Sequence, residues 1–150
     1  MTDFEYREYD PAFIMGFEYD GVEAKTLEGK MNVNLLIHGF ARYGPAWIGI
    51  WRGRCVGGCG ILPISPGVGQ TWMFFNKAAR PFAKTIVREI KKRTEPLMEE
   101  YDWHRLHTFV PAYSEEAVRF AECLGYSRES LMSMFGPNKE DYYVYAKLRG

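Results

Sequence analysis

Residues 67–101 read GVGQTWMFFNKAARPFAKTIVREIKKRTEPLMEEY, and this stretch decides the fold. The run Thr71–Phe75 is short, apolar and aromatic and follows two glycines, which predicts a buried strand. From Ala83 to Tyr101 the apolar residues recur at spacings of three and four. That spacing predicts a long helix with one apolar stripe.

A short basic segment, Asn76–Pro81, connects this strand to this helix. Pro81 suits the first turn of the helix, where its missing N–H group is tolerated. Pro96 lies inside the helical pattern and predicts a kink or a break near Thr94. A strand that runs straight into a helix brings free backbone N–H groups and the positive end of the helix dipole to one place. We expect a phosphate-bearing ligand, if the chain binds one, at this junction.

Length and composition exclude several classes of protein. A chain of 150 residues fits a single domain, residues 1–150, with a sizeable core. The hydrophobic share of 47% argues against disorder. The formal net charge is zero, so the composition does not favour a nucleic-acid partner. No apolar run is long enough to span a membrane.

The three cysteines predict a reduced, cytoplasmic protein, because they cannot all pair. Cys55 and Cys59 should project from the same side of a strand, too far apart to form a disulfide. Neither has a Cys or His partner at metal-ligand spacing, so we expect no metal site. Residues 1–5 are acidic and lack the apolar segment of a signal peptide.

The rest of the chain predicts further strands and helices. In chain order they are a strand at Phe4–Tyr9, a short helix from Asp10 through Phe17, a loop or helical turn at Asp20–Gly29, a helix at Met31–Phe40, a hairpin of Ala46–Trp51 and Cys55–Ile64, a strand at Leu106–Val110, a helix from Ser114 to Gly125, and a closing hairpin of Ser130–Phe135 and Tyr142–Leu148. This order predicts a mixed sheet with helices on its faces. Glycines at positions 57, 58 and 60 lie inside a strand pattern, which indicates a bulge or a close backbone approach rather than a nucleotide loop.

The segment SEEAVRFAECLGY, residues 114–126, resembles a motif of the GNAT superfamily of N-acetyltransferases, Asn-x-x-Ala-x-x-Phe-Tyr-x-x-x-Gly-Phe. The residues that fit are Ala117, Phe120, Gly125 and Tyr126, and a closing hairpin follows as in that family. The resemblance covers nearly the whole chain. It implies an α/β (α+β) fold with a mixed, mostly antiparallel central sheet flanked by helices. The chain also resembles GNAT-like proteins of tailed phages and prophages.

The resemblance implies acetyl-CoA as co-substrate. Its pyrophosphate would bind at the strand-to-helix junction, and its pantetheine arm would lie between the strand ending near Phe75 and the strand ending near Val110. The cofactor-binding residues that it implies are Phe74, Phe75, Asn76, Lys77, Arg80, Ala83, Lys84 and Ser114.

The sequence departs from the family at several of these positions. The family's pyrophosphate loop resembles Arg/Gln-x-x-Gly-x-Gly/Ala, whose glycines allow the backbone N–H groups to face the phosphates. In the corresponding register, Arg80–Thr85, Pro81 lacks an N–H group and Phe82 adds bulk. Ser114 replaces the usual cofactor-binding Asn, and Ala121 replaces the Tyr that often protonates the leaving thiolate.

Acetyl transfer to an amine requires a base, a donor for the oxyanion and an acid for the thiolate. The candidate base is His107, with His104, Glu115 and Glu116 as alternatives. The candidate acid is Tyr113, because Tyr126 fits a position that packs against the core. The alternative, which the residues alone favour, is that His107 is a structural or solvent-facing histidine.

Basic residues crowd the start of the long helix, at Lys77, Arg80 and Lys84. Cations there oppose the helix dipole, and a bound anion would relieve the conflict. Ordinary solvated charges are the alternative.

Two functions of different classes follow. The first is an N-acetyltransferase that uses acetyl-CoA and an unknown amine or protein acceptor. The second is a catalytically degenerate GNAT-like binding or structural protein, phage-derived and located in a virion, and a CoA-binding regulator is a weaker third. An open V-shaped gap beside the central strand favours the first, whereas a gap filled by Phe82 or Trp72 favours the second. The aromatic terminal strand could form a homodimer edge.

Overall fold

The computed structural model describes residues 3–20 and 32–150, and its centre is a mixed sheet. The strands are β1 (Phe4–Glu8), β2 (Ala46–Trp51), β3 (Arg54–Ser65), β4 (Val68–Phe75), β5 (Arg105–Pro111), β6 (Ser127–Met132) and β7 (Tyr142–Leu148). Within the described residues they form a seven-stranded sheet in the order β1-β2-β3-β4-β5-β7-β6. Among the strand pairs of the described chain, β4–β5 alone is parallel. The predicted α+β fold with a mostly antiparallel sheet is therefore confirmed.

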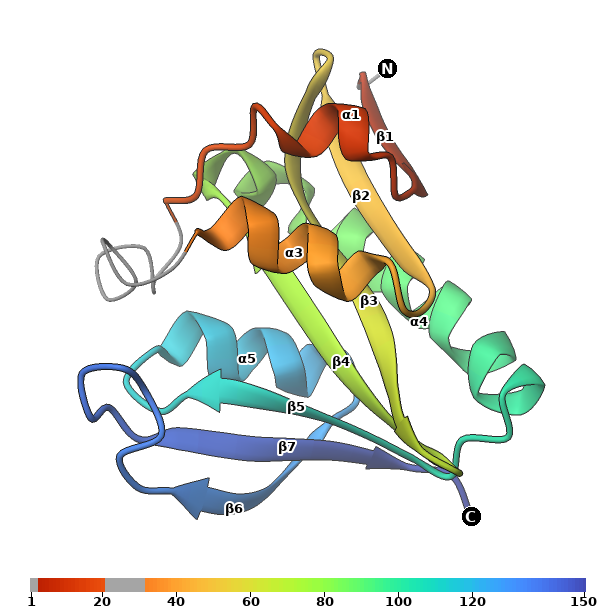
Figure 1. Cartoon of the computed structure of the whole chain (residues 1–150), viewed down its shortest axis with the longest axis vertical. Helices are drawn as coiled ribbons and strands as arrows, with labels where there is room; N and C mark the ends of the chain where they lie inside the picture. The colour runs from red at the N-terminus through yellow and green to blue at the C-terminus, as the bar shows by residue number, and fades with distance from the viewer. Residues whose placement is uncertain (1–2, 21–31) are drawn as a thin grey trace.

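Helices cover both faces of the sheet. They are α1 (Pro11–Ile14), α3 (Val33–Ala41), the 3₁₀ helix η1 (Lys77–Phe82), α4 (Ala83–Glu100) and α5 (Glu115–Cys123). In Figure 1, α1 and α3 lie in front of β2, β3 and β4, and α4 passes behind them. In the described part of the chain, no helix is long and apolar enough to cross a membrane. The expected loop or turn after Asp20 and the expected helix start at Met31 fall outside the described residues.

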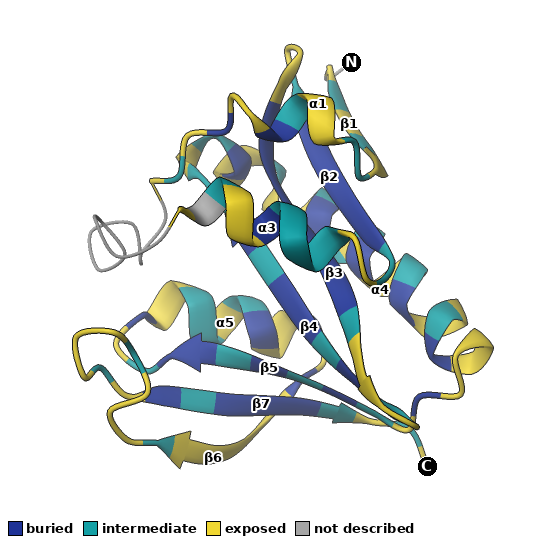
Figure 2. Cartoon of the chain, viewed as in Figure 1, coloured by how far each residue is buried: buried dark blue, intermediate teal, exposed yellow. Residues whose placement is uncertain are grey.

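Two apolar clusters hold the helices to the sheet, one on each face. Figure 2 shows that buried residues are concentrated along the strands of the sheet, whereas β6 is largely exposed. On one face Ile14 of α1 and Ile37 of α3 pack on β2, β3 and β4. On the other face Ile86 and Ile90 of α4 pack with α5, β5 and β7. Strands between two helical layers are buried on both sides, which explains why β2 is apolar throughout rather than alternating.

A β-bulge shifts the register between β2 and β3, as the glycines in this strand predicted. Gly49 pairs with Gly57 and Ile50 with Cys55, so β3 carries one extra residue there. The extra residue changes which face the side chains meet, because a strand alternates with a period of two. Cys55 consequently belongs to one core cluster and Cys59 to the other. The prediction that these two thiols project the same way is wrong, although all three cysteines are free as expected.

The segment after β4 is more helical than predicted. Residues 77–82 form η1 and run directly into α4, so Pro81 lies in the 3₁₀ turn rather than in the first turn of α4. The expected break near Thr94 is absent, and α4 is continuous through Pro96. Pro96 removes the N–H partner of the Lys92 carbonyl, but both residues are exposed, so water can take its place.

Several element ends differ from the predictions. The first helix ends at Ile14 rather than at Phe17. Strand β6 begins at Ser127, earlier than predicted, because Gly125 closes α5 with a positive φ of 92° and the chain pairs at once with β7. Strand β7 lies between β5 and β6, so the aromatic terminal strand has no free edge, and that predicted dimer contact is wrong.

Candidate functional site

Strands β4 and β5 part from each other after a short stretch of pairing. They pair at Val68 with Arg105, Gly69 with Leu106, and Gln70 with His107, and the register goes no further. We call the diverging segments, Thr71–Phe75 of β4 and Thr108–Pro111 of β5, the splay. Figure 1 shows the two strands meeting at one end and separating towards the other. The two strands therefore diverge in a V, the arrangement expected beside the central strand of an N-acetyltransferase.

Side chains from the α5 region reach β4 on one face of the splay. Thr71 Oγ1 and the Tyr126 hydroxyl are joined by a buried hydrogen bond of 2.7 Å. Phe75 meets Phe120 of α5 edge-on, with ring centroids 5.5 Å apart. Burial raises the pKa of Tyr126, so its hydroxyl stays protonated and serves as a structural donor or acceptor. Tyr126 is therefore a core residue, as predicted.

We expect Thr71→Val to lower the free energy of unfolding by about 1–3 kcal/mol, because the Tyr126 hydroxyl would stay buried without a partner. Tyr126→Phe should have a similar effect for the converse reason. The double variant should be much less destabilised than the sum, since neither polar group then remains. Urea unfolding of the wild type and the three variants measures this coupling, and strictly additive losses would contradict the hydrogen bond.

Neither aromatic residue suspected of filling the splay does so. Phe82 stacks on Phe4 of β1 at 4.5 Å and also meets Trp51 of β2. Trp72 packs against Phe74 and Phe40, under α3. A splay filled by Phe82 or Trp72, which would have favoured the catalytically degenerate protein, is thus not found among the described residues.

The backbone donors at the strand-to-helix junction are already bonded. The Lys77 N–H donates to Asp20 Oδ1 at 2.7 Å, and the Ala78 N–H donates to Asn76 Oδ1 at 3.1 Å. The Ala83 N–H donates to the Arg80 carbonyl, because η1 precedes α4 without a gap. The free N–H groups predicted at the start of α4 are therefore not found at these positions, and the carboxylate of Asp20 lies at the helix start.

The charged residues around this junction are exposed. Arg80 donates through Nε and Nη2 to both carboxylate oxygens of Glu116, at 3.3 and 3.2 Å, which links η1 to the first turn of α5. Lys77, Ala83 and Lys84 are also exposed. A surface pair of this kind contributes little to stability, so Arg80 can change partners readily.

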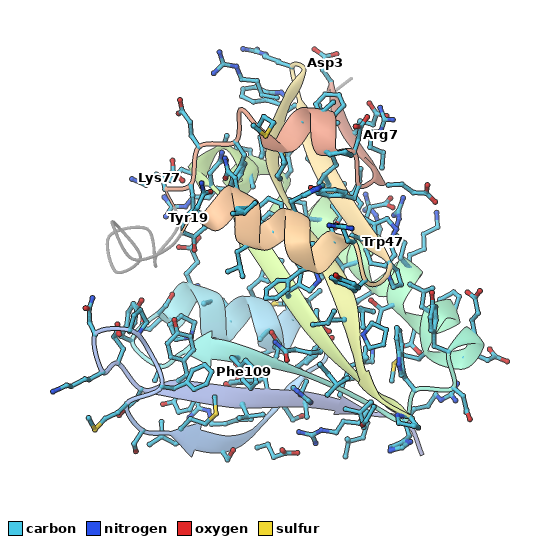
Figure 3. All side chains as sticks on the ribbon, in the orientation of Figure 1. Asp3, Arg7, Tyr19, Trp47, Lys77 and Phe109 are labelled. Carbon is cyan, nitrogen blue, oxygen red and sulfur yellow. The ribbon has the colours of Figure 1, made fainter. Side chains whose placement is uncertain are left out.

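The remaining predicted cofactor residues have structural partners. Asn76 Nδ2 donates to the Glu18 carbonyl while its Oδ1 caps η1. Ser114 is buried and caps α5, accepting from the Ala117 N–H at 3.1 Å. Phe74 and Phe75 point to opposite faces, since Phe74 meets Phe17 on the α1 side. Figure 3 shows Lys77 beside Tyr19, away from Phe109 on β5.

His107 lies at the point where β4 and β5 part. Leu106 and Val110 point into the core beneath α4 and α5, so His107, between them, faces the α3 side of the sheet. Arg105 Nε donates to His107 Nδ1 at 3.2 Å. Arg105 also donates to both carboxylate oxygens of Glu129, at 2.7 and 2.8 Å. Partial burial, followed by the charge of Arg105, lowers the pKa of His107.

Two residues beside His107, Arg105 and Glu129, were not predicted as site residues from the sequence. The spacing of Arg105 and His107, two residues apart on one strand, was the available signal for the first. Glu129 carried no signal, because it reaches Arg105 from β6 across the intervening strand β7, and this depends on how β6 pairs with β7.

The structure does not bring the other acid–base candidates to His107. About 13 Å of strand separates His107 from Pro111, and Tyr113 lies beyond that. Tyr113 is half exposed between β5 and α5. His104 precedes β5 at the closed end of the splay. Its backbone N–H donates to the Gly67 carbonyl at 2.9 Å. Glu115 is exposed in the first turn of α5.

An apolar groove of about 550 Å³ lies on the same face as His107, between α3 and β3. Its wall includes Leu36 and Phe40 of α3 and Leu62 of β3. Leu62 pairs with Gln70, and Gln70 pairs with His107. The groove and His107 therefore share one row across the sheet. In the described part of the chain, no group of three or more His, Cys, Asp or Glu could hold a metal ion.

Comparison with known proteins gives matches in structure only. No protein-family description matches the sequence, and no curated protein matches it. Among solved structures, Ard1 from Thermoplasma volcanium is similar with a TM-score of 0.76 at 14% identity, over 97% of both chains. The yncA protein of Salmonella typhimurium, solved with its cofactor acetyl-CoA, has a TM-score of 0.73 at 11% identity, over 97% of this chain and 94% of that one. A GNAT-family acetyltransferase from Bacillus anthracis has a TM-score of 0.72 at 12% identity, over 97% of this chain and 95% of that one.

Proposed function

We propose that residues 1–150 form a single N-acetyltransferase domain, which transfers an acetyl group from acetyl-CoA to an amine of a small molecule or a protein. The observation that carries this proposal is the splay, where β4 and β5 stop pairing after Gln70 and His107. The similarity in fold to acetyltransferases, one of them solved with acetyl-CoA, supports it.

The residues around the splay fit acetyl-CoA in part. The pantetheine arm would lie between Thr71–Phe75 and Thr108–Pro111, since Phe82 and Trp72 both pack elsewhere. The pyrophosphate would bind near Lys77, Arg80 and Lys84. It would replace Glu116 as the partner of Arg80 and compete with Asp20 for the Lys77 N–H group.

Acetyl-CoA supplies an activated acyl group when bound. Transfer forms a bond between the acceptor nitrogen and the acyl carbon and breaks the carbon–sulfur bond, and the nitrogen's proton ends on the thiol. The amine would approach over the apolar groove between α3 and β3, whose wall suits an uncharged body next to the amine. Tyr113 stays the predicted acid, and His107, at the closed end of the splay, is the second predicted catalytic residue.

A thermal-shift titration with acetyl-CoA tests the proposed function. At about a hundredfold excess over its dissociation constant, a specific ligand adds about 2.7 kcal/mol of stability, and the unfolding temperature should rise by several degrees. Dephospho-CoA and pantetheine serve as fragments, and pantetheine alone should give a smaller shift. No shift at millimolar acetyl-CoA would refute the acetyltransferase.

Two variants locate the ligand in the same titration. Arg80→Gln should weaken the shift, because a pyrophosphate partner is lost. Arg88→Gln, an exposed residue of α4, is the matched control and should leave the shift unchanged. Equal shifts in both variants would place the pyrophosphate elsewhere.

The hydrogen bonds that already engage the backbone N–H groups at the strand-to-helix junction favour a second function. A GNAT-like protein that no longer binds CoA would have no use for free donors at the start of η1, and here Asp20 and Asn76 take them. Such a protein would act as a binding or structural part, and an origin in a phage with a place in its particle belongs to this alternative. The acetyltransferase itself we place in the cytoplasm, in line with three free thiols. Homodimer formation stays a prediction.

A further inference from the structure

Two residues in series hold the ring of His107. Glu129 binds Arg105 through two hydrogen bonds, and Arg105 Nε donates to His107 Nδ1. A guanidinium has only donors and stays charged at all ordinary pH values. Nδ1 must therefore be the acceptor, and a neutral His107 ring carries its proton on Nε2.

We propose that His107 is a fixed N–H donor that binds an oxygen of the substrate through Nε2, rather than the general base. Arg105 is its positioning residue, held in turn by Glu129. This inference rests on the proposed acetyltransferase function and assigns a role within the same site. A ring whose Nδ1 lone pair is engaged and whose Nε2 is protonated has no free basic nitrogen with which to take a proton from an amine.

The neighbours of His107 favour the neutral ring. Across the sheet it pairs with Gln70 of β4 and Ala146 of β7, and both are uncharged. Its charged contacts in the described structure are Arg105, on its own strand, and Glu129 behind that arginine. Protonation would place a second cation against the guanidinium. Burial first and Arg105 second lower the pKa of His107, and Glu129 raises it by less, so the net shift is downward and favours the neutral ring around pH 7.

The place of the donor fits the chemistry of acyl transfer. His107 belongs to the last residue pair before the splay opens. A pantetheine arm that runs from a pyrophosphate near Lys77 along the splay would carry its thioester towards this closed end. A neutral imidazole N–H can stabilise the negative charge that develops on the carbonyl oxygen, without giving up its proton. The proton lost by the attacking amine ends on the sulfur, so His107 is unchanged at the end of the reaction. The same donor could bind a carbonyl oxygen of the acceptor instead.

NMR of protein with ¹⁵N-labelled histidine tests the tautomer directly. The His107 signals are assigned by their loss in His107→Gln. At neutral pH we expect the ring proton on Nε2 in at least a roughly tenfold excess over Nδ1. The hydrogen bond that the charged Arg105 donates to Nδ1 stabilises the tautomer in which Nδ1 carries no proton. A ring protonated on Nδ1 in the wild type, or an even mixture, would overturn the proposal without any variant.

Three variants separate the charge of Arg105 from its hydrogen bond. Arg105→Lys keeps the charge, so the pKa of His107 should stay low, but without the guanidinium Nε the tautomers should mix. Arg105→Gln removes the charge, and the pKa of His107 should rise. Arg149→Gln, which removes an arginine paired with the exposed Asp102, is the matched control and should change neither property. An unchanged tautomer in both Arg105 variants, with dispersed spectra showing a folded chain, would refute the positioning role.

Titrations with acetyl-CoA, CoA and glycinamide identify the substrate oxygen that binds His107 Nε2. The Nε2 proton should shift downfield with acetyl-CoA but not with CoA if the partner is the thioester carbonyl. It should shift only with glycinamide, an amine with a carbonyl oxygen, if the partner is the acceptor. No shift with either probe, in a chain that acetyl-CoA stabilises thermally, would refute the donor. If acetyl-CoA fails to bind at all, the proposed function and the donor role fall together, while the ligand-free tautomer stands on its own spectrum.

Discussion

Gly57→Ala should lower the free energy of unfolding by roughly 2–5 kcal/mol. Gly57 has a φ of +147° at the bulge of β3, a conformation that side chains rarely adopt. A Cβ there would collide with the Phe74 carbonyl oxygen and the Phe75 ring, and it would lie 2.8 Å from the Phe75 Cα. Since backbone rather than a flexible side chain is in the way, β3 and β4 would have to separate.

The matched control for this substitution is Gly39→Ala. Gly39 lies in α3, and a Cβ there would meet no atom within 4 Å. Alanine should therefore stabilise the helix by about 0.5–1 kcal/mol, because it removes backbone freedom from the unfolded chain. Urea unfolding monitored by circular dichroism measures both variants. A loss below 1 kcal/mol for Gly57→Ala would show that β3 does not bend where we place the bulge.

Leu106→Ala should destabilise the protein by roughly 2–5 kcal/mol, as is usual for a large core side chain cut to alanine. Leu106 is fully buried, with 0% of its surface exposed, and it pairs with Gly69 in the short parallel contact between β4 and β5. An added Cβ on Gly69 would lie only 2.9 Å from Leu106 Cδ2, so the two strands pack tightly here. A cavity at this point would loosen the closed end of the splay as well as the core.

Leu148→Ala is the control, since Leu148 ends β7 opposite Arg105 and is 69% exposed. Its effect should stay within about 0.5 kcal/mol. Chemical denaturation again provides the measurement. Equal effects at positions 106 and 148 would be incompatible with a core that reaches the closed end of the splay.

The order of elements could be predicted because each leaves a local pattern. The apolar run Thr71–Phe75 and the three-and-four spacing after Ala83 decided the central strand and helix, and both are confirmed. The glycines around position 57 indicated the bulge. Helix α5 followed from its Ser114 cap and its Gly125 stop. Strands, helices, caps and bulges of this kind depend on residues that are close in sequence, so one sequence is enough to predict them.

The details of the site depend on partners distant in sequence, and these could not be predicted. Asp20 bonds the backbone of Lys77, and Glu129 holds Arg105 from another strand. The spacing of apolar and polar residues along the sequence does not indicate such contacts. The continuity of α4 through Pro96 was missed for a different reason, because the missing hydrogen bond faces solvent and therefore costs less than it would in a buried helix interior.

The parting of β4 and β5 creates two open strand edges in the middle of a sheet. Along Thr71–Phe75, β4 is paired with β3 on one side, and along Thr108–Pro111, β5 is paired with β7 on the other. Within residues 3–20 and 32–150, no strand pairs with the backbone groups on the inner sides. Open edges usually invite another chain to add a strand, but here the two face each other inside one molecule with helices across them. An extended ligand with amide groups, roughly 15 Å long, could bond to both edges as a short inserted strand, and its length would be set by the five residues of β4 that remain unpaired on that side.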